Sequence, residues 1–226
     1  MSVVPDATTP TRGYRSPLRD EQAAETRSRI LSAAAELFAS NGYGGTSLSR
    51  IGELAGVSVE TVKASGFKRD LLLAAFENSF AGMEGIESLA THAPVAEITA
   101  DLDNARYLAG IMHFLAESNR RSSRLWTALV SAAVSDLELS TKLDGLQERR
   151  RADILVLVDE LQNRGIATSS IPPETHADTL SFILSPEGYN QLVHDSGWSQ
   201  EAYEGWLIRT VPALSGHSAQ ISQTQE

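Results

Sequence analysis

Apolar residues recur three or four positions apart in one stretch of this chain after another. No stretch alternates apolar and polar residues as a half-buried strand would. This spacing predicts an all-α fold of about nine helices. The expected helices cover residues 21–40, 46–55, 59–65, 68–80, 105–118, 123–134, 140–164, 174–195 (with a kink or break at Pro186) and 199–214.

The distribution of these helices predicts three parts of the chain. Residues 1–20 are rich in Pro, Thr, Ser and Arg and lack a periodic apolar pattern, so we expect a disordered N-terminal arm. Residues 21–80 form a small domain whose last helix links it to the remainder. Residues 81–226 form a larger domain that ends in a short disordered tail. Residues 81–100, which contain two glycines and a proline, are expected to be an irregular connector.

The most specific local pattern is TSLSRIGELAGVSVETVKAS, beginning at Thr46, and it predicts a helix-turn-helix. Ile51 and Ala55 belong to the apolar stripe of a two-turn helix, whose first free N–H groups a hydroxyl of residue 46 or 47 would cap. Gly56 ends this helix, because glycine tolerates the left-handed backbone that stops one. Ser58 then serves as the N-cap of a second helix.

The second helix runs to Ser65, and only Val62 is obliged to face inward. A helix with so little apolar surface is poorly held by its own packing, but it has the right size to enter a DNA major groove about 12 Å wide. The alternative is an ordinary corner between two helices inside a helical domain. The predicted outer face consists of Val59, Glu60, Lys63 and Ala64.

The stretch from residue 22 to residue 75 resembles the tetracycline-repressor (TetR) family of bacterial transcription regulators. The resemblance is carried, in order, by TRSRILSAAAELF at 26–38, NGY at 41–43, TSLSRIG at 46–52, AGVS at 55–58, TV at 61–62 and KRDLL at 68–72. It implies a three-helix DNA-binding domain followed by a larger ligand-binding and dimerisation domain. It also implies a ligand-responsive repressor that binds a palindromic operator as a homodimer. The alternative is a helical small-molecule-binding or interaction protein that has lost its affinity for DNA.

Two positions differ from what such proteins usually carry. An aromatic residue, often Tyr, is usual where Lys63 stands, and Phe is usual where Gly66 stands. Lys63 is still able to reach a phosphate, as a flexible point charge in place of a phenol. Gly66 removes a core side chain, and we expect Phe67 to turn inward and fill the space.

The net charge of −10 is unevenly distributed. Residues 1–80 contain nine Lys and Arg against nine Asp and Glu, so the other 146 residues carry the entire excess of acid. Residues 42–69 hold four basic side chains against two acidic ones, which predicts a small positive surface beside an acidic body. Arginines in the N-terminal arm could also follow DNA, although a solvated tail is the simpler expectation.

The resemblance and the outer face together predict the residues that contact double-stranded DNA. Basic side chains are expected to hold phosphates, the outer face of the second helix to meet the bases, and short hydroxyls to donate to phosphate oxygens. The predicted contacts are Thr46, Ser47, Arg50, Ser58, Val59, Glu60, Thr61, Lys63, Ala64, Lys68 and Arg69.

In such regulators the middle helices enclose an apolar cavity for a small effector. The candidates here combine aromatic, aliphatic and titratable side chains from two adjacent predicted helices, which suits a small and mostly apolar ligand. Ordinary core packing is the alternative for each of them, and for the histidine in particular. The predicted lining is Tyr107, Ile111, Met112, His113, Phe114, Trp126, Leu129 and Val130.

By the same resemblance, the last two helices pair with those of a second copy as a four-helix bundle. Two reading helices would then meet two half-sites about one DNA turn apart, roughly 34 Å. The alternative is that these helices only cover the core of one chain. The predicted interface residues are Leu180, Ile183, Leu184, Leu192, Tyr203, Trp206, Leu207 and Val211.

Other classes of function have little support in the sequence. The five histidines show no metal-ligand spacing, and no nucleophile elbow or Gly-rich phosphate loop is present, so we expect neither an enzyme nor a cofactor. The absence of cysteine excludes disulfides and thiol chemistry. No apolar run is long enough for a membrane span or a signal peptide, so we expect a cytoplasmic protein with no membrane partner.

Overall fold

The computed structural model describes residues 17–168 and 170–215, and these ranges contain helices, turns and no strand. The predicted all-α fold is therefore confirmed. The helical elements are α1 (Pro17–Asn41), α2 (Leu48–Ala55), α3 (Val59–Ala64), α4 (Lys68–Ala81), a short 3-10 helix (Leu89–Thr91), α5 (Ala93–Thr99), α6 (Asn104–Ala133), α7 (Leu137–Asn163), α8 (Pro173–Ile183), α9 (Pro186–Tyr189), a π-helical turn (Asn190–Asp195) and α10 (Gln200–Leu214).

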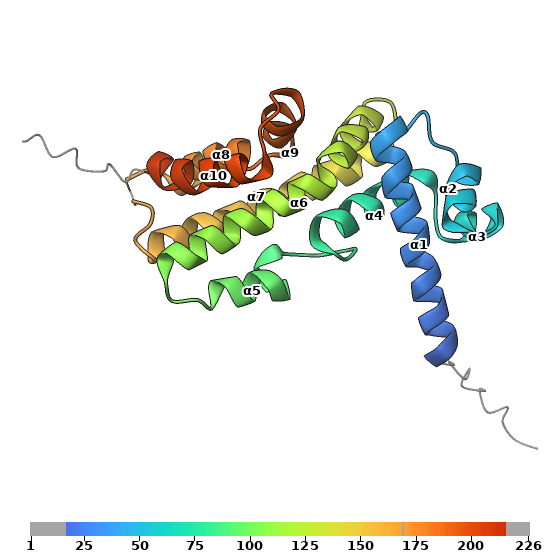
Figure 1. Ribbon diagram of the computed structural model, residues 1–226, viewed down its shortest axis with the longest axis horizontal. Helices are drawn as coiled ribbons and strands as arrows, with labels where there is room; N and C mark the ends of the chain where they lie inside the picture. The colour runs from blue at the N-terminus through green and yellow to red at the C-terminus, as the bar shows by residue number, and fades with distance from the viewer. Residues whose placement is uncertain (1–16, 169, 216–226) are drawn as a thin grey trace, which may run out of the picture.

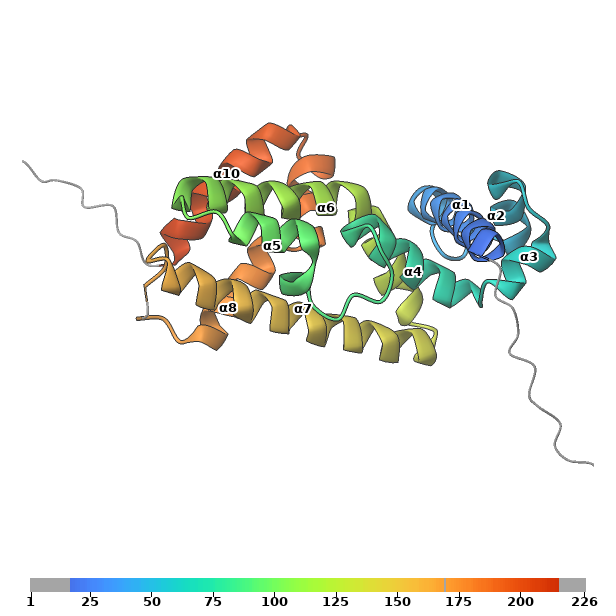
Figure 2. The ribbon, with the colours of Figure 1, turned by 90° about the horizontal axis from the view of Figure 1, so that it is seen from below.

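The molecule is elongated, with a small head at one end and a helical body at the other (Figures 1 and 2). α6 and α7 run side by side along the body. α8 and α10 lie against one side of this pair, and α5 lies on the opposite side. α1, α2 and α3 form the head. α4 joins the head to the body, because it packs against both α1 and α6.

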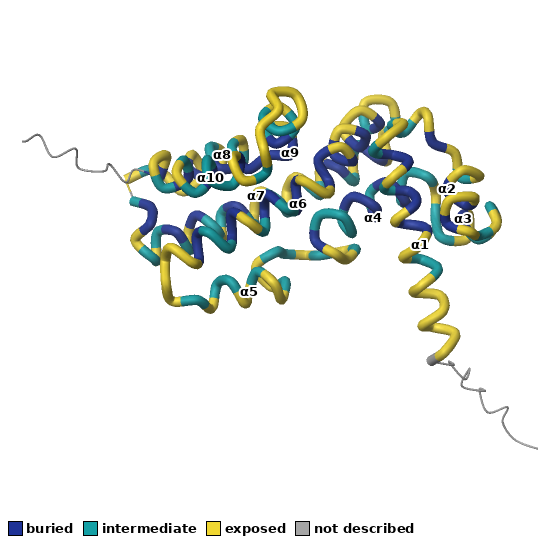
Figure 3. The backbone as a smooth tube through the Cα atoms, in the orientation of Figure 1, coloured by how far each residue is buried: buried dark blue, intermediate teal, exposed yellow. Residues whose placement is uncertain are grey.

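Two clusters of buried apolar side chains hold these helices together, and their helix faces appear as the dark segments of Figure 3. The first cluster fills the head and continues into the corner between α6 and α7, where Trp126, Leu129 and Leu139 belong to it. The second fills the body between α6, α7, α8 and α10. The division between the two cores therefore falls within α6, and the head shares its core with one end of the body.

α1 begins four residues before the predicted helix, at Pro17. Residues 17–20 were predicted to belong to a disordered arm, and this part of the prediction was wrong. Proline is well tolerated in the first turn of a helix, where its missing N–H is not needed. The side chains of residues 18–25 are exposed, so this end of α1 extends beyond the head (Figure 3). Residues 1–16 of the predicted arm and residues 216–226 of the predicted tail lie outside the described residues.

A single helix, α6, replaces the two helices predicted for residues 105–118 and 123–134. The polar run between them suggested a break, but its side chains are satisfied without one. Ser122 donates to the carbonyl of Ser118 (2.7 Å), and Asn119 donates from Nδ2 to the carbonyl of Leu184 (3.2 Å). Arg121 donates to the last carbonyls of α4. These bonds attach the middle of α6 to its neighbours.

The connector between the two parts is more ordered than predicted. Pro94 lies in the first turn of α5, where it starts a helix and does not interrupt one. The predicted break at Pro186 is confirmed, because α8 ends at Ile183 and Ser185 caps a new helix by accepting a hydrogen bond from the N–H of Gly188 (2.9 Å).

Candidate functional site

The helix-turn-helix of the head is closed by two serine caps and a glycine turn. Ser47 accepts a hydrogen bond from the N–H of Arg50 (3.2 Å) at the start of α2, and Ser58 accepts one from the N–H of Thr61 (3.1 Å) at the start of α3. Between them Gly56 has φ 66°, the left-handed conformation in which a side chain is disfavoured. Local hydrogen bonds thus fix the angle at which α3 leaves α2.

α3 presents one face to the core of the head and the other to solvent. Val62 is fully buried and anchors the helix, whereas Glu60, Lys63 and Ala64 are exposed and Val59 is half-buried. These four outward positions are the ones predicted from the sequence to face a major groove. The head therefore carries a short helix at the end of the molecule (Figure 1), and two charged side chains, Glu60 and Lys63, lie on its exposed face.

A shallow groove beside α3 gathers three of the basic side chains predicted to contact DNA. Lys63, Lys68 and Arg69 line it together with the ring of Tyr43, and the Lys68 ammonium lies 4.2 Å from the centre of that ring. Burial lowers the pKa of Lys68 from its usual value. Arg69 is already engaged, because its Nη2 lies 2.5 Å from Glu138 Oε2 at the start of α7.

The hydroxyls predicted to reach phosphates differ in how they are used. Thr46 is buried, and its Oγ1 donates to the carbonyls of Leu37 (3.0 Å) and Gly42 (2.9 Å), so the prediction that it contacts DNA was wrong. Its hydroxyl stabilises the end of α1 instead. Ser47 and Ser58 are exposed caps, and Thr61 lies 3.0 Å from the Ser58 hydroxyl.

Phe67 does not turn inward to fill the core space at Gly66, so this prediction was wrong. Phe67 is 67% exposed and begins α4 as its N-cap residue, with the Arg69 guanidinium 4.7 Å from the ring centre. Gly66 itself has φ 137°, which side chains disfavour, and its N–H donates to the carbonyl of Lys63 (3.2 Å). Glycine at this position therefore serves the turn between α3 and α4, and the backbone aims Phe67 outward.

Arg27 positions α3 from the neighbouring helix, and the sequence analysis did not identify it. Its Nη1 donates to the carbonyl of Ser65 at the end of α3, and its Nη2 lies 2.6 Å from Glu84, beyond the end of α4. One side chain of α1 thereby ties the end of the reading helix to the junction with the body. Arg27 lies one turn before the buried Ile30 and Leu31 of α1, and the local sequence pattern gave no signal of this role.

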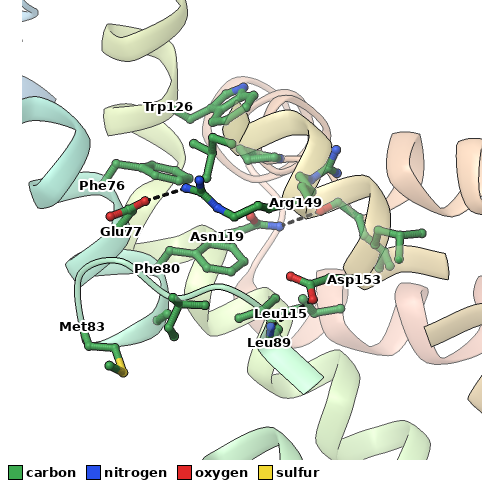
Figure 4. A pocket seen from close by; sticks show the side chains of 17 residues that line it. Phe76, Glu77, Phe80, Met83, Leu89, Leu115, Asn119, Trp126, Arg149 and Asp153 are labelled. Atoms are coloured by element: carbon green, nitrogen blue, oxygen red, sulfur yellow. Dashed lines mark hydrogen bonds and ion pairs between the residues drawn. The ribbon is translucent and has the colours of Figure 1, made fainter. Parts of the chain in front are cut away.

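The body contains a cavity between α4, α6 and α7 (Figure 4). Its internal volume is about 90 Å³. Its walls are mainly apolar. Glu77 of α4 and Arg149 of α7 form an ion pair of 2.8 Å across one side. The other apolar and polar groups on its walls include Phe76, Phe80, Leu115, Asn119, Trp126, Arg150, Asp153 and Ile154.

A second cavity, with an internal volume of about 120 Å³, adjoins the first and lies under α5. Tyr107, Ile111 and Phe114 line it, whereas Trp126 lines the first cavity and donates from Nε1 to Glu187 (2.6 Å). Half of the predicted lining residues therefore lie at a cavity. The two cavities share the wall residues Leu89, Leu115, Asp153 and Ile154.

The other four predicted lining residues lie elsewhere. Met112 and Leu129 are fully buried among core side chains. Val130 is 38% exposed on the outer face of α6, and the His113 side chain is 64% exposed and lies 3.1 Å from Glu204 of α10. Neither borders a cavity, because α6 turns these two positions away from α7. The interpretation of His113 as a core histidine was also wrong.

The predicted dimer residues also divide into two groups. Five of them are buried within a single chain and have no surface left for a partner: Leu180, Leu184, Tyr203, Leu207 and Val211. The prediction that they form the interface was therefore wrong. Ile183, Leu192 and Trp206 are only partly buried. The apolar periodicity of α8 and α10 described the faces that pack on α6 and α7.

The head and the helical body together define a class, the helix-turn-helix proteins with an all-α regulatory domain. Residues 30–63 match the family model described as "Bacterial regulatory proteins, tetR family". The chain therefore carries the DNA-binding sequence pattern of the TetR family, and the resemblance inferred from the sequence is confirmed. No match was found among curated proteins.

Similar folds occur in solved structures of bacterial proteins described as transcriptional regulators or repressors. A Rhodococcus sp. protein described as a TetR-family transcriptional regulator is 20% identical, covers 85% of this chain and 99% of its own, and gives a TM-score of 0.65. The regulator FadR of Bacillus subtilis, solved in complex with stearoyl-CoA, is 16% identical with a TM-score of 0.64, and 84% of this chain and 97% of that chain are covered. NalD, the secondary repressor of the MexAB-OprM multidrug efflux pump in Pseudomonas aeruginosa, is 19% identical with a TM-score of 0.59, with 84% and 95% covered.

These likenesses extend over most of each chain, so the body as well as the head has the fold of TetR-family transcriptional regulators. Within residues 17–168 and 170–215, no helix is long and apolar enough to cross a membrane.

Proposed function

We propose that this protein is a transcriptional regulator that binds double-stranded DNA through α3. The observation that carries the proposal is the pairing of a capped α3 with a groove lined by Lys63, Lys68 and Arg69. Lysine and arginine hold phosphates and position the head, while the outer face of a recognition helix reads base edges. In this arrangement Glu60 and Ala64 meet bases, and Glu60 tolerates cytosine N4 while it is repelled by most other edges.

The test is a mobility shift of the purified protein on the DNA that flanks its own gene, at two salt concentrations. A specific complex that competitor DNA does not displace supports the proposal, and its affinity must fall as salt rises because counterions are released from phosphates. Genome-wide operator selection would then identify the site. No specific complex in either experiment would refute DNA binding.

The finer features of the proposal are a homodimer, a palindromic operator, repression and release by a small effector. A single α3 spans six residues and reads only a few base pairs, so two heads related by a two-fold axis are needed for a specific site. The cavity beside α4 supports a ligand response, because α4 packs against both the head and α6. The effector must prefer the head spacing that does not fit DNA, since a ligand with equal affinity for both states shifts nothing.

A second candidate is a helical ligand-binding protein without DNA affinity. The observation in its favour is the state of the basic groove, where Arg69 is paired with Glu138 and the net charge of the chain is −10. Ligand binding with no DNA complex at low salt would support this candidate over a regulator.

A further inference from the structure

We propose that the effector is an amphipathic anion, with a carboxylate or phosphate head held by Arg150 and an apolar body held by the cavity between α4, α6 and α7. The inference deepens the proposed function and depends on its ligand-response part. It starts from the charges on the cavity wall. Two guanidinium groups, Arg149 and Arg150, and two carboxylates, Glu77 and Asp153, border this space.

Three of these four charges are already matched by groups on other elements. Glu77 and Arg149 neutralise one another at 2.8 Å. Oδ1 of Asp153 accepts from the Ser88 hydroxyl (2.7 Å) and the Leu89 N–H (3.0 Å), and so caps the 3-10 helix that closes one wall. The positions of Glu77, Arg149 and Asp153 on the wall can be followed in Figure 4.

Arg150, like Asp153, has only neutral hydrogen-bond partners, but it is a cation. Nη1 donates to the Ser181 hydroxyl and Nη2 to the Ser181 carbonyl, each at 2.6 Å, and no carboxylate lies within ion-pair distance in the described part of the chain. Burial lowers the pKa of this guanidinium from its usual value. Arg150 is partly buried and feels the charge of Glu187 without forming an ion pair with it, so an anionic ligand beside Arg150 would gain a favourable charged interaction.

The remainder of the wall suits an apolar body. Phe76, Phe80, Leu115, Trp126 and Ile154 contribute aromatic and aliphatic surface along the same space. A guanidinium binds planar carboxylates and phosphates through paired hydrogen bonds, which gives orientation as well as affinity. The apolar chain of a longer ligand would extend toward the adjoining cavity under α5, which shares the wall residues Leu115 and Ile154 with the first cavity.

Calorimetric titration of the full chain with four ten-carbon probes below their micellar concentrations tests the charge preference. The probes are decanoate, decyl phosphate, 1-decanol and decyltrimethylammonium. Decanoate or decyl phosphate should bind at least ~10-fold more tightly than decanol, as expected for a charged hydrogen bond, and the better of the two identifies the head group. Tighter binding of the ammonium probe than of both anions would overturn the proposal and would assign the site to Asp153.

Variants of two neighbouring arginines on α7 test the residue. Arg150→Met should weaken the anion by ~10- to 100-fold and leave decanol unchanged. Arg151→Met is the matched control, since Arg151 faces out toward Asp178 and should bind like wild type. Unchanged anion affinity in a folded Arg150→Met protein would overturn the assignment. If that variant does not fold, Arg150→Lys replaces it in the test. Lysine keeps the positive charge but lacks the paired N–H donors of a guanidinium, so this variant should lose part of the preference for anions. An unaltered preference would count against Arg150.

The same titrations separate this inference from the proposed function. If decanol binds as tightly as the anions, the cavity is a ligand site and only its charge preference is wrong. If no probe binds, both the anionic effector and the ligand response fail, while a mobility shift without ligand still tests DNA binding alone.

Discussion

Lys63 is the basic residue whose position on the head bears most directly on DNA binding. It lies on the exposed face of α3, and no ion pair involves it among the described residues. A charge held this way is available to a phosphate, whereas Arg69 must first leave Glu138. In the proposed complex, Lys63 therefore holds a DNA phosphate by its charge, where an aromatic residue would contact it differently.

We expect Lys63→Ala to weaken DNA binding to a similar extent on all sequences. The slope of log affinity against log salt should become shallower by about 0.9, the contribution of one phosphate contact. Titrations at four or more salt concentrations on a specific and a random duplex measure both quantities. Arg151→Ala removes the same charge from the body and should leave the slope unchanged. A wild-type slope for Lys63→Ala would contradict the phosphate role.

Gly66 and Phe67 give a prediction about stability. Gly66→Ala should destabilise the protein by about 1–2 kcal/mol, because a side chain disfavours φ 137° even though its nearest neighbour, Asp70 Cβ, leaves room at 3.6 Å. Phe67→Ala should cost less than about 1 kcal/mol, since the exposed ring makes only a cation–π contact, whereas a core Phe costs about 3–5 kcal/mol. Urea unfolding of both variants decides this, and a larger loss for Phe67→Ala would contradict it.

At the scale of elements, the sequence predicted most helices where a cap or an apolar stripe marks them. The starts of α3 and α10 follow from their N-caps, Ser58 and Ser199, because caps are local chemistry. α4 also begins at Lys68 as predicted. The continuity of α6 was not predicted, because the polar side chains in its middle, Arg121 and Asn119, form hydrogen bonds with distant elements. Such tertiary bonds leave no local pattern.

The candidate site was likewise predicted from the sequence only in part. The outer face of α3 was predictable, because a six-residue helix with one buried side chain has few ways to pack. The cavity was only half predictable. Periodicity identifies an apolar face, but it does not say whether a position such as Leu129 meets the core or a void. The polar wall of the cavity, including Arg150, was missed because charged residues on α7 are indistinguishable in sequence from a solvated face.

The outer face of α8 gives a prediction about assembly. Phe182 is 76% exposed there and adjoins the partly buried Ile183, which leaves apolar surface on this face. We propose that this face pairs with a second copy. Phe182→Asp should then weaken the dimer at least ~10-fold and shift sedimentation toward the monomer at low concentration.

Leu102→Asp is the matched control for this experiment. Leu102 is 94% exposed in the turn before α6, and the variant should sediment like wild type. A Phe182→Asp protein that remains fully dimeric at every concentration would move the interface elsewhere.

At the scale of the whole molecule, ion pairs connect the head to the body on either side of α4. Arg69 meets Glu138 and Asp70 meets Lys142 (3.2 Å), so the start of α4 is fixed to the start of α7. Further along α4, Glu77 meets Arg149 at the cavity. One helix therefore carries contacts to the reading head and to the ligand space. Under the proposed ligand response, a ligand that displaces Arg149 acts on the head through α4 and α1, because α4 packs against α1.

The Arg69–Glu138 pair gives the last prediction, because it places one phosphate-binding charge under the control of the body. Glu138→Gln removes the competing carboxylate, so Arg69 becomes available to DNA. Affinity at low salt should rise, and the salt slope should steepen by up to about 0.9. Glu148→Gln, an exposed change of the same charge on the same helix, controls for the general loss of acid and should give a smaller rise at an unchanged slope. If Glu138 instead serves mainly to orient the head, Glu138→Gln will bind less tightly at an unchanged slope. The salt slope therefore shows whether Glu138 mainly keeps the Arg69 charge from DNA or mainly positions the head, whether the affinity rises or falls.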